Sequence, residues 1–277
     1  MTRLLASVVN LFSTVGWRPN IGMPAGSGDR WPEDYERGRP SYPPEVVDVP
    51  GLPLTSTVLD LGAGTGKLTR LLVTTFSGVV AVEPAQAMRR LLATNCQEAQ
   101  VLAGSAEEIP LADASVDAVF AAEAFHWFDG ERALTEIARV LRPRGTLVLM
   151  WNLPAGPTEP SIASVDRLVR ERAPRDLEYD PSDLNAARYA SGEWRAAFAG
   201  SPFEELQEAR LLNPQTLSRD DLVAFLASMG WIADLPDVHR LPLLEEIRSL
   251  LSADEYRRPW ETHVCWTRLR GGASRTA

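Results

Sequence analysis

The chain has 277 residues, of which 45% are hydrophobic, and its formal net charge is −9. A chain of this length and composition can bury a full core, so a disordered polypeptide is excluded. The acidic balance, with a pI near 5.0, argues against a broad surface for nucleic acid or an anionic membrane, because those partners need clustered lysine and arginine.

Residues 1–28 are predicted to be an N-terminal tail. Arg3 and the apolar stretch 4–15 imitate a signal peptide, but polar residues dilute that stretch. It is also too short to span a bilayer. The alternatives are a frayed tail, a helix on the surface or an over-long assigned start. We expect residues 29–277 to form a single domain.

Residues 29–50 are predicted to form a lid segment. Prolines recur throughout it, and proline at this density forbids a long helix and favours a stiff segment that crosses over something. Trp31, Tyr35, Arg39 and Tyr42 lie among these prolines. Such side chains either face a ligand or anchor the arm onto the core.

The stretch 58–68 is expected to build the ligand site. A short apolar run ends in Asp60, passes through Gly62, Gly64 and Gly66, and enters a segment with leucines at helical spacing. This pattern predicts a buried strand, a tight turn and a helix. Glycines bring the backbone close to a ligand, and the helix N-terminus offers unpaired N–H groups. Such a crossing usually holds a nucleotide-like molecule.

Spacing narrows the choice of nucleotide. A phosphate-binding P-loop would need Gly and Ser or Thr where Leu61 and Leu68 stand. In a dinucleotide fingerprint the third glycine would come one residue after Gly66, so a nicotinamide cofactor is disfavoured. The next apolar run ends in Glu83, whose carboxylate can accept hydrogen bonds from both ribose hydroxyls and would repel a 2′-phosphate.

Strand and helix patterns alternate between residues 57 and 151. Strands are expected near 57–61, 79–83, 99–103, 116–121 and 145–151. Right-handed crossovers through the intervening helices impose a parallel sheet covered on both faces. Ligands bind such a sheet at the carboxyl ends of its strands, where the strand order reverses.

The pattern loosens after the fifth strand. Residues 153–201 contain a helical run at 162–172 between stretches rich in proline and polar residues, and we predict a cap inserted over the site. The remaining elements are expected to be a strand at 203–212, a helix at 218–229, a helix at 238–251 and a strand at 260–269.

These motifs resemble the class I S-adenosylmethionine (SAM)-dependent methyltransferases. The resemblance rests on V-L-D-L-G-A-G-T-G at 58–66, V-E-P at 82–84, G-S-A-E-E-I-P-L at 104–111 and D-A-V-F at 117–120. Y-E-R-G-R-P-S-Y-P at 35–43 and E-A-F-H-W-F at 123–128 resemble the trans-aconitate methyltransferase-like branch of small-molecule enzymes. Several segments in one order are more specific than a single glycine pattern.

The resemblance implies a fold, a cofactor and a set of contacts. The fold is α/β, a Rossmann-like, doubly wound, seven-stranded and mostly parallel sheet with an antiparallel last strand and an inserted cap. The cofactor is SAM, and the product is S-adenosylhomocysteine (SAH). The implied cofactor contacts are Tyr35, Asp60, Gly62, Ala63, Gly64, Gly66, Glu83, Met88, Ala106, Glu107 and Glu123. Met88 could equally be ordinary helix-to-sheet core.

The acceptor side is implied by fewer residues. The candidates are Arg39, Tyr42, Trp127, Trp151 and Ser228. Aromatic walls favour an apolar or flat molecule, and Arg39 is the one cation that we can assign to an acceptor carboxylate. Ser228 resembles a serine of the pocket-lining turn in this branch, although Gly230 replaces a second serine often found there. The acceptor therefore stays open.

His126 is the candidate catalytic residue. It follows the fourth strand, and an imidazole can take a proton from a hydroxyl or amine near neutral pH. The alternative is that His126 shapes the pocket wall by packing. An acceptor carboxylate would need no base.

The cysteines and histidines predict neither disulfide nor metal. Cys96 and Cys265 lie far apart, which fits a reducing cytoplasm. The three histidines form no H-E-x-x-H or Cys/His cluster. We expect a cytoplasmic protein without a membrane span, monomeric or homodimeric.

The leading hypothesis is a methyltransferase that acts on an oxygen or nitrogen atom of a small molecule, chiefly by in-line positioning. The alternatives are a protein or nucleic-acid methyltransferase, which should show an open trench, and a non-catalytic SAM-binding protein. A dehydrogenase using a nicotinamide cofactor is a weaker alternative.

Overall fold

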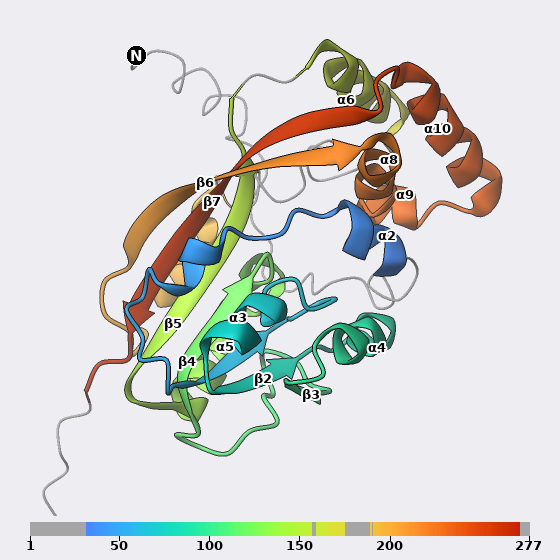
Figure 1. The fold of residues 1–277 in the computed structure, drawn as a ribbon. Coiled ribbons are helices and arrows are strands. Elements are labelled where there is room, and N and C mark those ends of the chain that lie inside the picture. The colour runs from blue at the N-terminus through green and yellow to red at the C-terminus, as the bar shows by residue number, and fades with distance from the viewer. Residues whose placement is uncertain (1–31, 157–158, 175–188, 190, 272–277) are drawn as a thin grey trace, which may run out of the picture.

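The computed structural model describes residues 32–156, 159–174, 189 and 191–271 (Figure 1). The predicted tail at 1–28, Trp31 and the central part of the predicted cap lie outside the described residues. The further prediction that 29–277 form one domain stays a prediction.

The predicted seven-stranded sheet is confirmed, with strand order β3-β2-β1-β4-β5-β7-β6. Strands β1 to β5 run parallel, and β7 is inserted antiparallel between β5 and β6. The strands are β1 (Thr57–Leu61), β2 (Gly78–Val82), β3 (Gln100–Leu102), β4 (Val116–Ala122), β5 (Leu141–Pro154), β6 (Gln207–Ser218) and β7 (Glu255–Arg268). The order reverses at β1, whose neighbours are β2 and β4, so the ligand edge lies at the ends of these strands.

The helices surround this sheet in chain order. They are α2 (Pro32–Gly38), η1 (Pro44–Val47), α3 (Thr69–Thr75), α4 (Gln86–Asn95), η2 (Phe125–Trp127), α5 (Gly130–Val140), α6 (Pro160–Arg172), η3 (Glu193–Phe198), α8 (Arg219–Ala227), α9 (Gly230–Ala233) and α10 (Asp237–Leu250). Among the residues that the structure describes, no helix combines the length and the apolar character that a bilayer crossing requires.

The predicted bounds of the last two strands were wrong. Strand β6 starts at Gln207 rather than at 203 and continues to Ser218, and β7 already begins at Glu255. Pro214 and Pro259 lie within these longer strands and face each other in the β6–β7 register. Proline has no backbone N–H, so both strands lack a hydrogen-bond donor at the same paired position. The hydrogen bonding between the strands is interrupted only there and continues on both sides.

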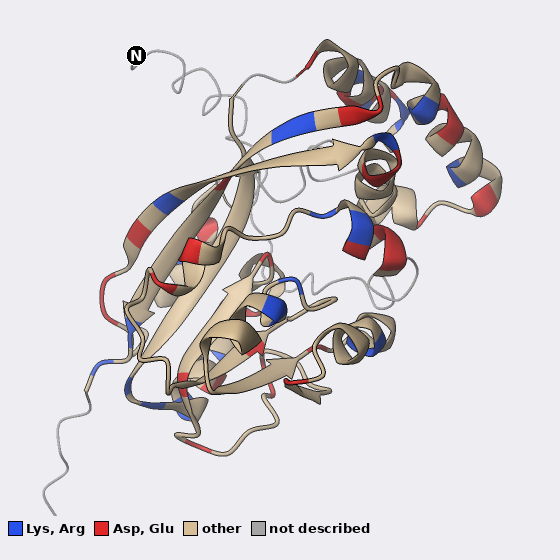
Figure 2. Ribbon diagram, in the orientation of Figure 1, with Lys and Arg blue, Asp and Glu red and all other residues tan. Residues whose placement is uncertain are grey.

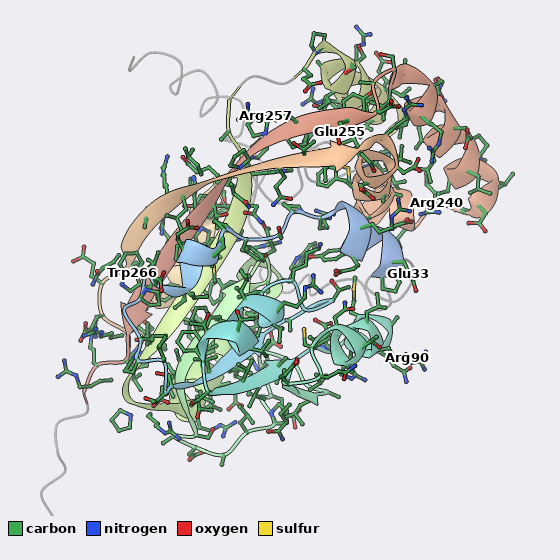
Figure 3. The ribbon with its side chains drawn as sticks, viewed as in Figure 1. Glu33, Arg90, Arg240, Glu255, Arg257 and Trp266 are labelled. Atoms are coloured by element: carbon green, nitrogen blue, oxygen red, sulfur yellow. The ribbon has the colours of Figure 1, made fainter. Side chains whose placement is uncertain are left out.

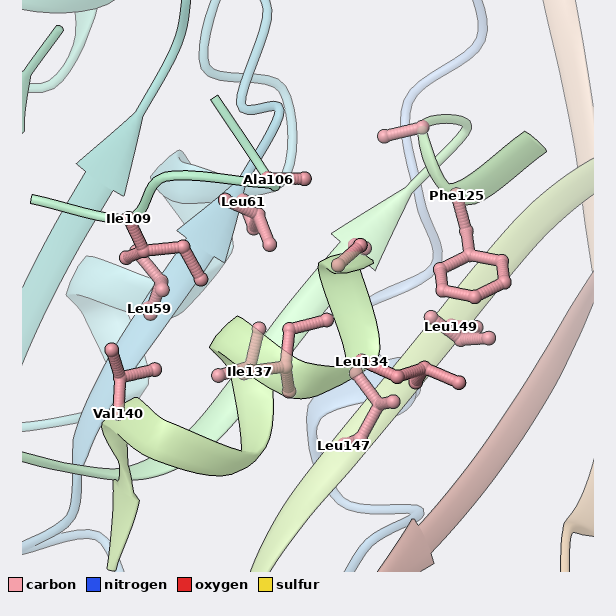
Figure 4. Packing of buried hydrophobic residues seen from close by; sticks show 14 of the residues in the cluster. Leu59, Leu61, Ala106, Ile109, Phe125, Leu134, Ile137, Val140, Leu147 and Leu149 are labelled. Atoms are coloured by element: carbon pink, nitrogen blue, oxygen red, sulfur yellow. The ribbon is translucent and has the colours of Figure 1, made fainter. Parts of the chain in front are cut away.

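Successive side chains of the strands point to opposite faces of the sheet and pack in two separate cores. Leu59, Val119 and Leu149 point to the face covered by α5, whose Leu134 and Ile137 pack between them (Figure 4). Residues one position earlier or later, such as Val58, Phe120 and Val148, pack with α3 and η1 on the other face. This two-residue period decides which side chains at the strand ends can reach a given pocket.

A third core lies in a group of helices beyond the sheet. Helices α6, α8, α9 and α10 pack around Tyr256 and Trp260 of β7. Figure 1 shows this group at one end of β6 and β7, with α2 between it and the helices α3 and α4. Of the predicted cap, α6 joins this group, whereas Trp194 and Phe198 of η3 pack against the α5 face.

Candidate functional site

A pocket of about 800 Å³, partly open to solvent, lies at the carboxyl ends of β1 and β4. Residues of α2, α8 and β7 complete its walls. The structure brings together many of the predicted site residues in this wall. They are Tyr35, Arg39, Tyr42, Asp60, Gly62, Ala63, Gly64 and Glu123.

The three glycines of the β1–α3 loop have different roles. All have positive φ, but a Cβ on Gly62 would lie 2.8 Å from Ala124 Cβ, and one on Gly66 would lie 2.7 Å from Cys96 Sγ. Gly62 and Gly66 are therefore required by packing within the protein as well as by their backbone. Gly64, with φ +58°, has only the Tyr35 ring edge nearby, at 3.9 Å, and borders the pocket.

Glu83 ties the glycine loop to the end of β2. Its Oε2 accepts a hydrogen bond from the Gly64 N–H at 2.8 Å, and its Oε1 accepts one from the Ala85 N–H at 2.8 Å. The side chain is buried and lies behind the loop rather than in the pocket wall. Glu83, the acidic residue that follows β2, thus contacts the glycine loop directly through Gly64.

Asp60 is a buried carboxyl at the end of β1. Its Oδ2 accepts a hydrogen bond from Thr69 Oγ1 at 2.6 Å. Burial raises the pKa of Asp60 to about 7, although the Thr69 hydrogen bond acts in the opposite direction. A cation bound in the pocket would favour its ionised form.

Glu123 follows β4 with a strained backbone. Its φ is +53°, in the left-handed region that costs a residue with a Cβ about 1–2 kcal/mol. Its N–H donates to the Met150 carbonyl at 2.8 Å, and its Oε1 accepts from the Asn152 N–H at 2.5 Å. This conformation brings a second carboxylate to the pocket wall.

The aromatic cover over the glycine loop comes from α2 and the residues that follow it. Tyr35 lies over Gly64, and the Arg39 guanidinium lies 5.4 Å from the Tyr35 ring centroid. Burial raises the pKa of Tyr35 to about 12 and that of Tyr42 well above its ordinary value. Both phenols therefore stay protonated at neutral pH.

Arg39 is held in position by α8 and the turn after it. Its Nε donates to Ser228 Oγ at 2.9 Å and its Nη2 donates to the Ser228 carbonyl at 3.1 Å. The guanidinium also lies 5.4 Å from the Phe225 ring centroid. Ser228 is not itself in the pocket wall, so it contributes by orienting Arg39.

Glu36 fastens α2 to the glycine loop. Its carboxylate accepts hydrogen bonds from Thr65 Oγ1 at 2.5 Å and from Arg70 Nη2 at 2.8 Å, and its carbonyl accepts one from Lys67 Nζ at 2.6 Å. The opposite side of α2 is tied to the helix group by the Arg37–Asp221 ion pair at 3.0 Å. Helix α2 thus bridges the two halves of the pocket.

The residues predicted to contact adenine lie outside the pocket wall. Met88 is buried in α4, and Ala106 packs in the α5-face core. Glu107 Oε1 accepts a hydrogen bond from the N–H of Asp129, which caps α5. Their roles toward a cofactor stay predictions.

The predicted aromatic and catalytic residues behind β4 are not brought to the pocket wall. Trp151 is fully buried on the α5 face, and its Nε1 donates to His126 Nδ1 at 3.2 Å. The His126 ring packs against Trp127, with centroids 5.0 Å apart. Asn152, the next residue along β5, points to the opposite face and lines the pocket. A catalytic role for His126 stays a prediction.

Several wall residues were missed by the sequence reasoning. Phe225 and Met229 come from the α8 region, and Arg258 and Trp260 come from β7. All four are buried; Arg258 and Trp260 reach the pocket because β7 folds back beside β5, and Phe225 and Met229 because α8 packs against α2. Within the described ranges, no group of three or more His, Cys, Asp or Glu side chains is arranged to hold a metal ion.

Comparisons with known proteins agree with this geometry. The methyltransferase domain family matches residues 59–149. An uncharacterized methyltransferase of Schizosaccharomyces pombe is 32% identical over 229 residues, covering 80% of this chain and 83% of that protein. An uncharacterized methyltransferase of Mycobacterium tuberculosis is 56% identical over 118 residues, covering 43% of this chain and 49% of that protein, so the match spans about half of the mycobacterial relative.

The fold also has a solved counterpart. A provisionally assigned type II methyltransferase from Anaeromyxobacter dehalogenans superposes with a TM-score of 0.60 at 24% identity, covering 84% of this chain and 97% of that chain. At this identity the likeness concerns the fold alone.

Proposed function

This chain belongs to the class I SAM-dependent methyltransferases, and on that premise we propose that it transfers a methyl group from SAM to an oxygen or nitrogen atom of a small-molecule acceptor. The observation that carries the proposal is the Gly64–Glu83 contact beside a pocket whose wall includes the carboxyl groups of Asp60 and Glu123. Asp60 and Glu123 provide negative charge at the strand ends, where a sulfonium cofactor would need it.

The residues present fit that cofactor. Gly64 leaves the loop open to a ligand, because only the Tyr35 ring lies near it. Glu83 is buried at the end of the second strand and is positioned by two backbone N–H groups, so its carboxylate is oriented before a ribose arrives. We propose that the glycine loop, Asp60 and Glu83 hold the cofactor.

The protein's part in the reaction is to hold the acceptor. When bound, SAM supplies a methyl group that is already electrophilic. Orientation of an acceptor atom contributes up to about 7–11 kcal/mol in favourable cases. Phe225, Met229 and Trp260 offer an apolar wall for this purpose, and α2 with α8 limits the access of water.

Residues of α2, α8 and β7 line the pocket together with the strand ends, and this wall supports a small acceptor over a macromolecule. We also propose that the insertion at 153–201 acts as part of the cover, since Pro154 borders the pocket. For a hydroxyl or amine acceptor, His126 remains our candidate base; for a carboxylate no base is needed.

The test is calorimetry with SAM and SAH on the folded protein. We expect both to bind, and Glu83→Ala to weaken binding by about 1.5–3 kcal/mol because a hydrogen-bonded charged group is lost. Glu98→Ala removes an exposed carboxylate near the end of α4 and serves as the matched control. No binding of either compound to the wild-type protein would overturn the proposal.

A further inference from the structure

The pocket wall carries charges of both signs. Asp60 and Glu123 lie at the strand ends with Lys67 of the glycine loop nearby, whereas Arg39 and Arg258 both lie near Phe225. The Arg39 guanidinium is 5.4 Å from the Phe225 ring centroid and that of Arg258 is 5.1 Å from it. The carboxylates suit a cationic cofactor, and the two guanidinium groups near Phe225 suit an anion.

The two arginines have different neighbours. Arg39 lies over Tyr35, which covers Gly64, so it is the guanidinium closer to the cofactor loop. Arg258 is 8% exposed and lies 5.2 Å from the Trp260 ring centroid. The rings of Phe225 and Trp260 restrict the Arg258 guanidinium group. A restricted guanidinium group loses little conformational entropy when it binds an oxyanion.

Arg258 also borders a second pocket, which we call the arginine annex. The annex is partly open, with about 620 Å³ of empty space that includes solvent, and it shares Pro154, Arg258 and Trp260 with the main pocket. Arg170 of α6 and Arg257 of β7 also belong to its lining. Figure 2 shows Lys and Arg in blue on this part of β7, and Figure 3 labels Arg257 there.

The annex contrasts with the rest of the protein. The chain carries a net charge of −9, yet the described residues that line the annex include three arginines and one acidic residue, Asp166. Such a local excess of guanidinium is the arrangement by which proteins recognise carboxylate and phosphate groups.

We propose that the acceptor is an elongated organic anion, whose carboxylate or phosphate group is bound by Arg258 at the junction of the main pocket and the arginine annex. The apolar body of this molecule lies along Phe225, Met229 and Trp260, with its reactive end toward the cofactor loop. This inference rests on the proposed function, because it takes the main pocket as the acceptor site. Arg258 is then a residue that determines acceptor specificity.

The test uses the full chain saturated with SAH and four eight-carbon probes: octanoate, octyl phosphate, neutral octanamide and cationic octyltrimethylammonium. Calorimetry should show the anionic probes binding about 10-fold or more tightly than octanamide, as expected for a charged hydrogen bond. The stronger of octanoate and octyl phosphate identifies the anionic group. Equal binding of anionic and neutral probes would overturn the inference.

Variants assign the effect to Arg258. We expect Arg258→Gln to lower anion affinity about 10-fold or more and to leave octanamide and SAH binding unchanged, with partial recovery in Arg258→Lys, which keeps the charge and loses the fork. Arg268→Gln removes an exposed arginine at the far end of β7 and is the matched control. An equal response to Arg258→Gln and Arg268→Gln would refute the assignment.

Two further results keep the outcomes distinct. Arg170 is exposed and lines the annex, so Arg170→Gln should reduce anion affinity by a smaller factor than Arg258→Gln. This variant tests the site if Arg258→Gln does not fold. An unchanged anion affinity in Arg170→Gln would then count against the annex. Failure of SAH to bind the wild-type protein overturns the proposed function. Normal SAH binding without anion preference overturns the acceptor inference alone.

Discussion

Replacement of Gly66 by alanine tests how the cofactor loop is built. Gly66 has φ +92°, and an added Cβ would lie 2.7 Å from Cys96 Sγ and 2.9 Å from Leu92 Cδ1. The left-handed backbone costs about 1–2 kcal/mol once a Cβ is present, and crowding a packed core costs about 1–3 kcal/mol more. We expect Gly66→Ala to lower the free energy of unfolding by about 2–5 kcal/mol, measured by urea denaturation.

Two companion variants separate these contributions. Gly192 has φ +70° and no atom within 4 Å of an added Cβ, so Gly192→Ala should lose only the backbone part, about 1–2 kcal/mol. Cys96→Ala removes the nearest crowding atom. The double variant Gly66→Ala, Cys96→Ala should therefore be more stable than the sum of its single variants predicts, by about 1 kcal/mol or more.

The reasoning has two points of failure. If Gly66→Ala lowers the free energy of unfolding by no more than Gly192→Ala does, Cys96 and Leu92 do not crowd a side chain at position 66. If the effects of Gly66→Ala and Cys96→Ala are simply additive, Cys96 is not the residue that excludes a side chain at position 66.

Three other predictions follow from the same contacts. Burial raises the pKa of Asp60 from 3.8 to about 7, so between these values the folded protein keeps a proton that the unfolded chain releases. The free energy of unfolding should therefore fall as pH rises from about 4 to 7. Asp60→Asn should abolish this decline, measured by thermal unfolding at each pH, and a pH profile equal to that of the wild type would contradict the prediction. Glu36→Ala removes the hydrogen-bond partner of Thr65 and Arg70 and should lower the free energy of unfolding by about 1–3 kcal/mol, measured by urea denaturation. An unaltered urea midpoint would show that these bonds do not hold α2. A Cβ on Gly38 would lie 2.0 Å from the Phe225 nitrogen, so Gly38→Ala should strip hydrogen-exchange protection from α2; retained protection would argue against its docking on α8.

The half of the site built from adjacent residues could be predicted from the sequence. Strand β1 runs from Thr57 to Leu61, as its apolar run and the following glycines indicate. The contact between Gly64 and Glu83 follows because β1 and β2 are parallel neighbours whose ends meet. Short-range patterns and one topological rule are sufficient here.

The choice between faces could not be predicted. Trp151 and Asn152 both end β5 at the ligand edge, but successive residues of a strand point to opposite faces. Only Asn152 reaches the pocket, and Trp151 joins His126 in the α5-face core. Which of the two residues faces the pocket depends on how β5 pairs with β4 and β7, and these pairings join residues far apart in the sequence.

The pocket wall supplied by α8 could not be predicted from the sequence either. Helix α8 is buried on every side, from Leu222 to Ala227, so its sequence carries no polar face that would mark one side as a pocket wall. Arg39 and Ser228 are 189 positions apart, and their hydrogen bond exists only because α2 docks on α8. No local pattern reports contacts of this range.

The position of β7 has a consequence for synthesis on the ribosome. The methyltransferase domain match ends at residue 149, and a nascent chain of that length already contains the cofactor loop and the strands beside it. Arg258 and Trp260 emerge about a hundred residues later, and β7 must then enter between β5 and β6. A chain truncated at residue 149 therefore contains the glycine loop but lacks the part of the pocket wall that α8 and β7 supply.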